Sequence, residues 1–295
     1  MSYMMSSIAQ SLEKLFSLEN KVILLTGAAG GIGSVFAEGF ASAGASVALC
    51  DLDVTVLGTI ADKISGKTPT GCRVPTGSQA PAGCQAPTGC RASCHHLDLM
   101  EMSTIKKCVD GVIAEYGRID VLVNCAGINK REGFLDVDES TYDRIMDINL
   151  KGMYFITQEA VKHMIKRKKG NIINIASHNS VGMLGGCSVY GASKSAVTAL
   201  TRSMAVEWTK HGIRANALAP GHILTPLTTV TWEHPERSKY LRERIAMERP
   251  GNPEELLGIA IMLASDSSSY INGTMIHVDG GCLAGGTPWP YDTKY

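Results

Sequence analysis

The chain has 295 residues, of which 44% are hydrophobic, and its 28 lysines and arginines balance 28 aspartates and glutamates. This length and composition suffice for one large core, and the balanced charge excludes a general attraction to nucleic acid or to a membrane surface. No apolar stretch approaches the ~20 residues that span a bilayer, and the amino end has no basic segment followed by an apolar core. We therefore expect a cytoplasmic protein without a membrane partner.

Residues 1–17 precede the first predicted strand and are interpreted as an N-terminal extension. Within it, Ile8, Leu12, Leu15 and Phe16 recur at helical spacing. This pattern predicts a short amphipathic helix that packs on the body of the protein.

A glycine-rich turn joins a strand to a helix near the amino end. Residues 21–26 form an apolar run typical of a buried strand, the glycines follow at once, and apolar residues continue at helical spacing from Val35 to Phe40. The start of such a helix presents backbone N–H groups to a pyrophosphate, and glycines leave room for its approach. The residues predicted to bind a dinucleotide here are Gly27, Gly31, Ile32 and Gly33.

A second predicted strand, residues 46–51, ends on an acid. A carboxylate at Asp51 can accept hydrogen bonds from an adenosine ribose and would repel a 2'-phosphate, so we predict NAD in preference to NADP. The alternative is that Asp51 and Asp53 only cap the next helix, a role that suits Asp53.

Four consecutive hexapeptides occupy residues 69–92, with the sequences PTGCRV, PTGSQA, PAGCQA and PTGCRA. Their proline and glycine content disfavours regular structure and predicts a mobile surface insertion. An alternative is a soft-metal site made from Cys72, Cys84, Cys90 and Cys94 with His95 and His96. These spacings match no closed zinc motif, so we expect no metal, and the scattered cysteines are predicted to be free thiols.

Tyr190 and Lys194 lie four residues apart in a predicted helix, and Ser177 lies thirteen residues upstream of the tyrosine. One helical turn makes the phenol and the ammonium neighbours. A positive charge about 4 Å away favours phenolate, so Lys194 is expected to lower the pKa of Tyr190 by about three units at most. A tyrosine adjusted in this way is suited to proton transfer at an alcohol or a ketone.

The ordered motifs resemble those of the short-chain dehydrogenase/reductase family from about Leu18 to Gly281. They comprise the glycine turn, Asn124–Gly127 after a strand, Asp147–Leu150 in a helix, Tyr190 with Lys194, Pro220-Gly221 followed by Thr225, and Asp279–Gly281. One departure is Cys125, where the family most often has a second asparagine.

The resemblance implies roles for particular residues. Tyr190 would move the hydroxyl proton, Ser177 would polarise the substrate oxygen, and Lys194 would bind the nicotinamide ribose, while Asn149 would hold a water that links Lys194 to solvent. Asp98 would bond the adenine amino group. The remaining cofactor contacts would come from Asn124, Ala126, Gly127, Pro220, Gly221 and Thr225. Hydride chemistry of this kind requires no metal.

Strands that alternate with helices predict an α/β fold, a single-domain doubly wound parallel sheet with helices on both faces. The resemblance makes this sheet Rossmann-type. The domain is expected to span residues 18–284, followed by a C-terminal tail of residues 285–295 that lies across a neighbouring subunit. Relatives are usually homotetramers paired through helices that here contain residues 150–165 and 193–208.

The substrate is predicted to be a small polar molecule. Residues 222–250 correspond to the variable lid of the family and are rich in threonine and charge. The chain most resembles gluconate 5-dehydrogenases and 2-dehydro-3-deoxygluconate 5-dehydrogenases, and Lys130, Arg131 and His178 are candidates to hold a carboxylate or polyol. The alternatives are a 3-oxoacyl thioester reductase and a dinucleotide-binding sensor or scaffold without catalysis.

Overall fold

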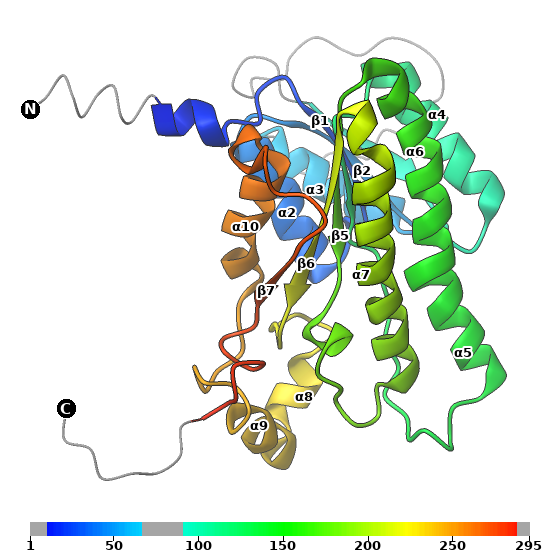
Figure 1. Cartoon of the computed structure of the whole chain (residues 1–295). Helices are drawn as coiled ribbons and strands as arrows, with labels where there is room; N and C mark the ends of the chain where they lie inside the picture. The colour runs from blue at the N-terminus through cyan, green and yellow to red at the C-terminus, as the bar shows by residue number, and fades with distance from the viewer. Residues whose placement is uncertain (1–10, 67–90, 288–295) are drawn as a thin grey trace, which may run out of the picture.

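A computed structural model describes residues 11–66 and 91–287 (Figure 1). Seven parallel strands form one sheet in the order β3-β2-β1-β4-β5-β6-β7. The inner strands are short, apolar and buried along most or all of their length, as expected for a parallel sheet covered on both faces. The strands are β1 (Val22–Thr26), β2 (Ser46–Asp51), β3 (Ala92–His96), β4 (Val121–Asn124), β5 (Gly170–Ile175), β6 (Ile213–Pro220) and β7 (Met275–Val278).

Helices cover both faces of the sheet, which confirms the predicted doubly wound, Rossmann-type fold (Figure 1). One face packs on α2 (Gly31–Ser42), α3 (Val54–Ile64) and α10 (Leu257–Ala264). The other packs on α4 (Met102–Tyr116), α6 (Met153–Arg167) and α7 (Ser188–Trp208). Helix α5 (Glu139–Met146) leads into α6 through a wider π-helical turn, Asp147–Gly152. Single 3-10 turns occupy His178–Ser180, Thr209–His211, Pro253–Leu256 and Asp266–Ser268.

The order of the strands reverses direction between β1 and β4, and this topology opens a crevice at their carboxyl ends. Thr26 pairs with Asn124, which in turn pairs with Asn174, so β1 and β4 end level with each other and β5 ends one residue further on. The glycine turn, Asn124–Gly127 and Ser177 follow these strand ends directly. The fold therefore brings the predicted site residues to one edge of the sheet.

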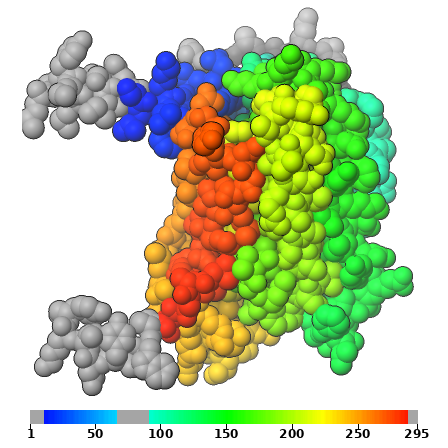
Figure 2. All heavy atoms as spheres, viewed as in Figure 1, coloured from blue at the N-terminus to red at the C-terminus, as the bar shows by residue number. Residues whose placement is uncertain are grey.

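The predicted lid, residues 222–250, contains the two short helices α8 (Thr229–Glu233) and α9 (Pro235–Arg242). The last described residues lie against it: Thr287 donates its backbone N–H and its hydroxyl to the carbonyl of Glu243, at 3.3 and 3.1 Å. Figure 2 shows these carboxyl-terminal residues in red beside the gold lid helices. The rest of the predicted tail, residues 288–295, lies outside the described residues.

The two predicted additions to the domain are described only in part. Residues 11–16 are helical as expected, but Leu12, Leu15 and Phe16 are exposed, so the predicted packing of this helix on the body is wrong. Residues 67–90, which hold almost all of the hexapeptides, lie outside the described residues, and Ala92 is the first residue of β3 rather than the end of the insertion.

No disulfide joins any two of the six cysteines in the described ranges. Among them, Cys94 is buried in β3 beside His95, whose ring nitrogen lies 2.8 Å from the Ser93 hydroxyl. Cys72, Cys84 and Cys90 of the alternative metal site lie outside the described residues. No helix in residues 11–66 or 91–287 combines the length and hydropathy needed to cross a membrane.

Candidate active site at the carboxyl edge of the sheet

The glycine turn between β1 and α2 has no room for side chains at two of its positions. A Cβ added at Gly33 would lie 2.0 Å from the Gly27 carbonyl oxygen, and Gly27 itself has a left-handed φ of +68°. A Cβ at Gly31 would lie 3.0 Å from the Cβ of Thr225 in the lid segment. Ile32 anchors the turn by packing against the core beneath α2. The predicted strand, turn and helix are confirmed, with the free N–H groups of the first turn of α2 at the crevice.

Asp51 faces this turn from the end of β2. Its carboxylate accepts the Ala29 N–H at 3.0 Å and the Leu52 N–H at 2.7 Å. Asp53 caps α3 by accepting the N–H groups of Thr55 and Val56, as predicted. The two acids therefore have different roles, and only Asp51 bonds to the glycine turn.

Asp98 follows β3 at the same edge, where its carboxylate accepts the Met100 N–H at 2.9 Å. The segment after β4 packs on the glycine turn: the Ala126 N–H donates to the Thr26 hydroxyl at 3.2 Å, and a Cβ at Gly27 would lie 2.6 Å from the Ala126 Cα. This contact fixes the floor of the crevice.

The Asn124 side chain is turned away from the crevice. Its amide nitrogen donates to the Thr157 hydroxyl and to Asn174 Oδ1, both at 2.8 Å. The side chain thus ties β4 to β5 and α6 in the core.

Ser177 and Tyr190 are brought together although they lie on different elements. Ser177 precedes the 3-10 turn after β5 and caps it by accepting the Asn179 N–H at 3.1 Å. Tyr190 lies in the first turn of α7, close enough to the Ser177 hydroxyl for that group to act on its pKa. The serine therefore caps a turn and lies near the phenol.

The pKa of Tyr190 moves in the direction opposite to the one predicted. Burial raises it, and the nearby Ser177 hydroxyl opposes only part of that rise. Burial also lowers the pKa of the Lys194 ammonium to about 8. The ammonium lies 5.8 Å from the centre of the Tyr190 ring and donates to the Ile175 carbonyl at 2.7 Å. Desolvation disfavours both the Tyr190 phenolate and the Lys194 ammonium, and it therefore outweighs the expected attraction between these two charges.

Lys194 and Asn149 meet at Gly127. A Cβ added at Gly127 would lie 3.2 Å from the Lys194 Nζ and 3.3 Å from Asn149 Oδ1. Asn149 lies in the π-helical turn, where its side chain accepts the Ile128 N–H at 2.8 Å and donates to the Ile128 carbonyl at 2.9 Å. It also donates to the Ser193 hydroxyl at 3.1 Å. Asn149 thus joins the π-helical turn to the segment after β4 and to α7, and lies beside Lys194.

Pro220 is the last residue of β6, and Gly221 allows close contact with the turn after β7. A Cβ at Gly221 would lie 2.5 Å from the Asp279 Cα. Thr225 lies near the start of the lid segment, and its N–H donates to the Thr228 hydroxyl at 2.9 Å. The lid thus starts beside the glycine turn and ends near the carboxyl-terminal residues.

Of the three residues predicted to hold a substrate, two lie together. Lys130 is paired with Glu132 at 2.6 Å and donates to the Thr141 hydroxyl at 3.0 Å. Both contacts hold the Lys130 ammonium at the surface. Arg131 reaches the lid, where it donates to the Thr231 hydroxyl at 3.4 Å. Burial lowers the pKa of His178, and the charge of Arg131 is close enough to act in the same direction.

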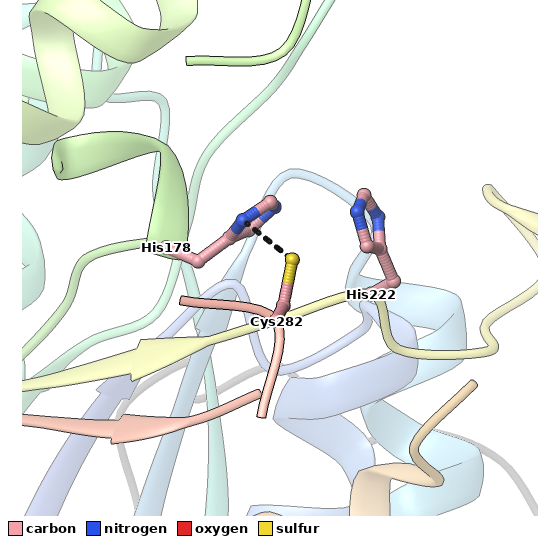
Figure 3. Close-up of side chains that lie close together, drawn as sticks. All are labelled: His178, His222 and Cys282. Atoms are coloured by element: carbon pink, nitrogen blue, oxygen red, sulfur yellow. Dashed lines mark hydrogen bonds between the residues drawn. The ribbon is translucent and has the colours of Figure 1, made fainter. Parts of the chain in front are cut away.

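Two residues at this edge were not identified as site residues from the sequence. His222 follows Gly221 and lies with its ring centre 4.5 Å from that of His178. Cys282 follows the turn after β7, and its sulfur lies 3.9 Å from His178 Nδ1 (Figure 3). The available signal was topological, since each residue directly follows a family motif at the end of a strand.

Comparison with known proteins identifies the family. The family described as enoyl-(acyl-carrier-protein) reductase matches residues 75–282. The chain is 38% identical over 272 residues to the 2-dehydro-3-deoxy-D-gluconate 5-dehydrogenase of Escherichia coli, covering 91% of this chain and 98% of that protein. It is also 38% identical over 272 residues to a 3-oxoacyl-[acyl-carrier-protein] reductase of Thermotoga maritima, covering 90% and 99%.

The fold matches solved structures over almost its full length. A gluconate 5-dehydrogenase from Burkholderia cenocepacia, solved in complex with NADP and tartrate, has a TM-score of 0.82 and 32% sequence identity, and the match covers 92% of this chain and 99% of that one. The chain therefore belongs to the short-chain dehydrogenase/reductase family and is an oxidoreductase acting on CH–OH groups.

Proposed function

We propose that this protein interconverts a secondary alcohol and a ketone on a sugar acid, with NAD in the crevice at the carboxyl edge of the sheet. The observation that carries this proposal is the placement of Ser177, after β5, near Tyr190 of α7 and Lys194, at the same edge of the sheet as the glycine-rich turn. A non-catalytic sensor would not need these groups together.

The residues present fit a dinucleotide. Gly31 lacks the side chain that would fill the gap between the first turn of α2 and Thr225, and Lys194 forms no ion pair with a carboxylate within residues 11–66 and 91–287. Asp51, at the end of β2, would accept the adenosine ribose hydroxyls, and its charge is the reason for preferring NAD. Asp98, Ala126, Gly127, Pro220, Gly221 and Thr225 line the same edge and would complete the site.

When bound, the nicotinamide supplies the hydride chemistry. Tyr190 would donate or accept the hydroxyl proton, and its raised pKa keeps the phenol protonated at neutral pH, which suits donation to a ketone oxygen. Ser177 would polarise that oxygen through its hydroxyl. Lys194 would bind the ribose, and Asn149, which approaches Gly127 beside the lysine, would connect the ammonium to solvent.

A sugar acid suits the groups around the reacting centre. Arg131 offers a guanidinium for the carboxylate, since its contact with Thr231 is a long hydrogen bond and not an ion pair. The side-chain oxygens of Asn129 and Asn179 are buried and have no hydrogen-bond partner among the described residues. Hydroxyl groups of a polyol would satisfy such oxygens. The Burkholderia enzyme was solved with tartrate, a hydroxy acid.

The proposal is tested by measuring turnover of gluconate-type acids, sorbitol and acetoacetyl thioesters with both dinucleotides. Arg131→Leu should raise KM for gluconate about tenfold or more, the value of a charge-assisted hydrogen bond, and leave KM for sorbitol unchanged. Lys130→Leu is the matched control, because Lys130 is already paired with Glu132, and should change neither. Preferential turnover of the thioester would instead support the second candidate, a 3-oxoacyl thioester reductase, which the Thermotoga relative favours.

We further propose a homotetramer. An open groove between α5, α6 and α7 is lined almost wholly by apolar atoms, including Leu150, Tyr154, Phe155 and Leu200. Tyr154 and Phe155 are 44% and 37% exposed, which is unusual for large apolar groups unless a partner covers them. The same helices were predicted to pair in the assembly. A reducing, cytoplasmic location suits the free thiols and is proposed on that basis.

A further inference from the structure

Two histidines and a cysteine converge beside the catalytic serine. His178 follows β5, His222 follows β6 and Cys282 follows β7, and these three strands are neighbours in the sheet. Because the strands are parallel, their carboxyl ends meet at one edge. Figure 3 shows the two imidazole rings on either side of the cysteine, whose thiol points between them.

The distances are close to those of a metal site. One ligand atom from each side chain lies within 4.8 Å of the other two, and His178 Nδ1 lies 3.9 Å from the Cys282 sulfur. In a tetrahedral zinc site with Zn–N of about 2.0–2.1 Å and Zn–S of about 2.3 Å, the nitrogen and sulfur are about 3.6 Å apart. That pair needs to close by only a few tenths of an ångström.

Two of the ligands are carried by well-defined turns. Gly280 and Gly281 have left-handed φ values of +63° and +81°, and the Asp279 carboxylate accepts the N–H groups of Gly281 and Leu283, both at 3.0 Å. These bonds hold the turn that presents Cys282. His178 begins the 3-10 turn that Ser177 caps. Supporting hydrogen bonds of this kind fix ligand geometry in metal sites.

The surrounding charges are mixed. Asp279 is negative and close enough to influence both imidazoles and the thiol, which favours a cation. Arg131 near the imidazoles and Arg244 near the thiol act against one. A thiolate on Cys282 adds a second negative charge, so the ion class must be one that binds thiolate strongly.

We propose that His178, His222 and Cys282 form a binding site for a thiophilic divalent metal ion of the zinc class, with three protein ligands and a fourth position open. Three ligands with an open position are typical of zinc sites that exchange a ligand, whereas structural zinc sites are closed by four. The ion takes no part in the hydride chemistry described above. It would link the turn after β7 to the segment of the catalytic serine.

The test uses the full-length protein and Co²⁺, whose thiolate complexes absorb in the near ultraviolet and whose tetrahedral complexes absorb in the visible. Titration should give one tight equivalent with both sets of bands, and Zn²⁺ should displace it and raise the Tm. X-ray absorption of the zinc form should give one sulfur at about 2.3 Å and two nitrogens at about 2.0–2.1 Å, a measurement that needs no variant.

Cys282→Ser and His222→Asn should each weaken binding by more than about 100-fold, and the serine variant should lose the thiolate band. Cys187→Ser, which removes another buried thiol, and His277→Asn, which removes an exposed imidazole on β7, are matched controls and should bind Co²⁺ like the parent protein. Circular dichroism and NADH binding verify that each variant is folded.

Two results would overturn the proposal. The first is the absence of a thiolate band and of a first-shell sulfur in the parent protein. The second is a band that survives in Cys282→Ser, which would place the ion on other cysteines, such as those of the hexapeptides. Neither result depends on which alcohol the enzyme oxidises, so the metal site and the proposed substrate are tested independently.

Discussion

The closest backbone approach in the glycine turn makes a quantitative prediction. In Gly33→Ala the new methyl would lie 2.0 Å from the Gly27 carbonyl oxygen, 2.8 Å from the Gly27 carbonyl carbon and 2.9 Å from the Ala28 Cα. The first contact is about 1.5 Å shorter than an ordinary contact of about 3.5 Å. All three neighbours are backbone atoms, so the strain cannot be relieved by rotating a side chain. We expect a loss of about 3 kcal/mol in the free energy of unfolding, the upper end for overpacking.

The same displacement should move the N–H groups at the start of α2. NADH affinity, followed by fluorescence titration, is expected to fall at least about tenfold, equivalent to about 1.4 kcal/mol. Gly258→Ala is the matched control: its Cβ would meet nothing within 4 Å, and alanine in α10 should add about 0.5–1 kcal/mol to stability without changing NADH affinity. Parental stability in urea denaturation together with parental NADH affinity in Gly33→Ala would refute this reasoning.

Three further substitutions test the site and its electrostatics. Tyr190→Phe should lower kcat by about 10²–10⁴ with NADH affinity nearly unchanged, because only proton transfer is removed; a variant that keeps most of its turnover would exclude Tyr190 as the acid. Asp51→Asn should raise the ratio of kcat/KM for NADP over NAD about tenfold, since it removes a charge that repels the 2'-phosphate; an unchanged ratio would place cofactor choice elsewhere. Burial lowers the pKa of His95 to about 4 in the folded chain. The unfolded chain, with an ordinary pKa near 6.5, binds a proton first, so stability should fall by up to about 3 kcal/mol as pH drops from about 6.5 to 4. His95→Gln should reduce this slope in denaturation curves, and an equal slope in both proteins would contradict the assignment.

Local sequence patterns were sufficient to predict a structural feature when all of its residues lie in one short segment of the chain. The glycine turn, the cap at Asp53 and the helix that holds Tyr190 and Lys194 each depend on residues close together in the chain, and each is confirmed. The alternation of strands with helices also predicted the doubly wound sheet. In such cases backbone sterics and periodicity decide the structure.

Features that depend on burial or on distant segments were not predictable in this way. The charge of Lys194 was expected to dominate the Tyr190 pKa, but the degree of burial of both groups is set by the packing of β5, α7 and the segment after β4. The core hydrogen bonds of Asn124 were not predicted because its partners, Asn174 and Thr157, come from elements further along the chain. The proximity of His222 and Cys282 to His178 could not be predicted, because it depends on three strand ends lying side by side in the sheet.

The widened turn around Asn149 limits how this chain can change in length. A π-helical turn holds one residue more than the α-helix that flanks it. Deleting a single residue between α5 and α6 would close the wide turn into an ordinary α-helical one and move Asn149 from its present position. Both helices would survive, but the amide would leave Ile128. One-residue gaps should therefore be rare here among active descendants of this enzyme, whereas point substitutions on the outer surface of the same helices should be common.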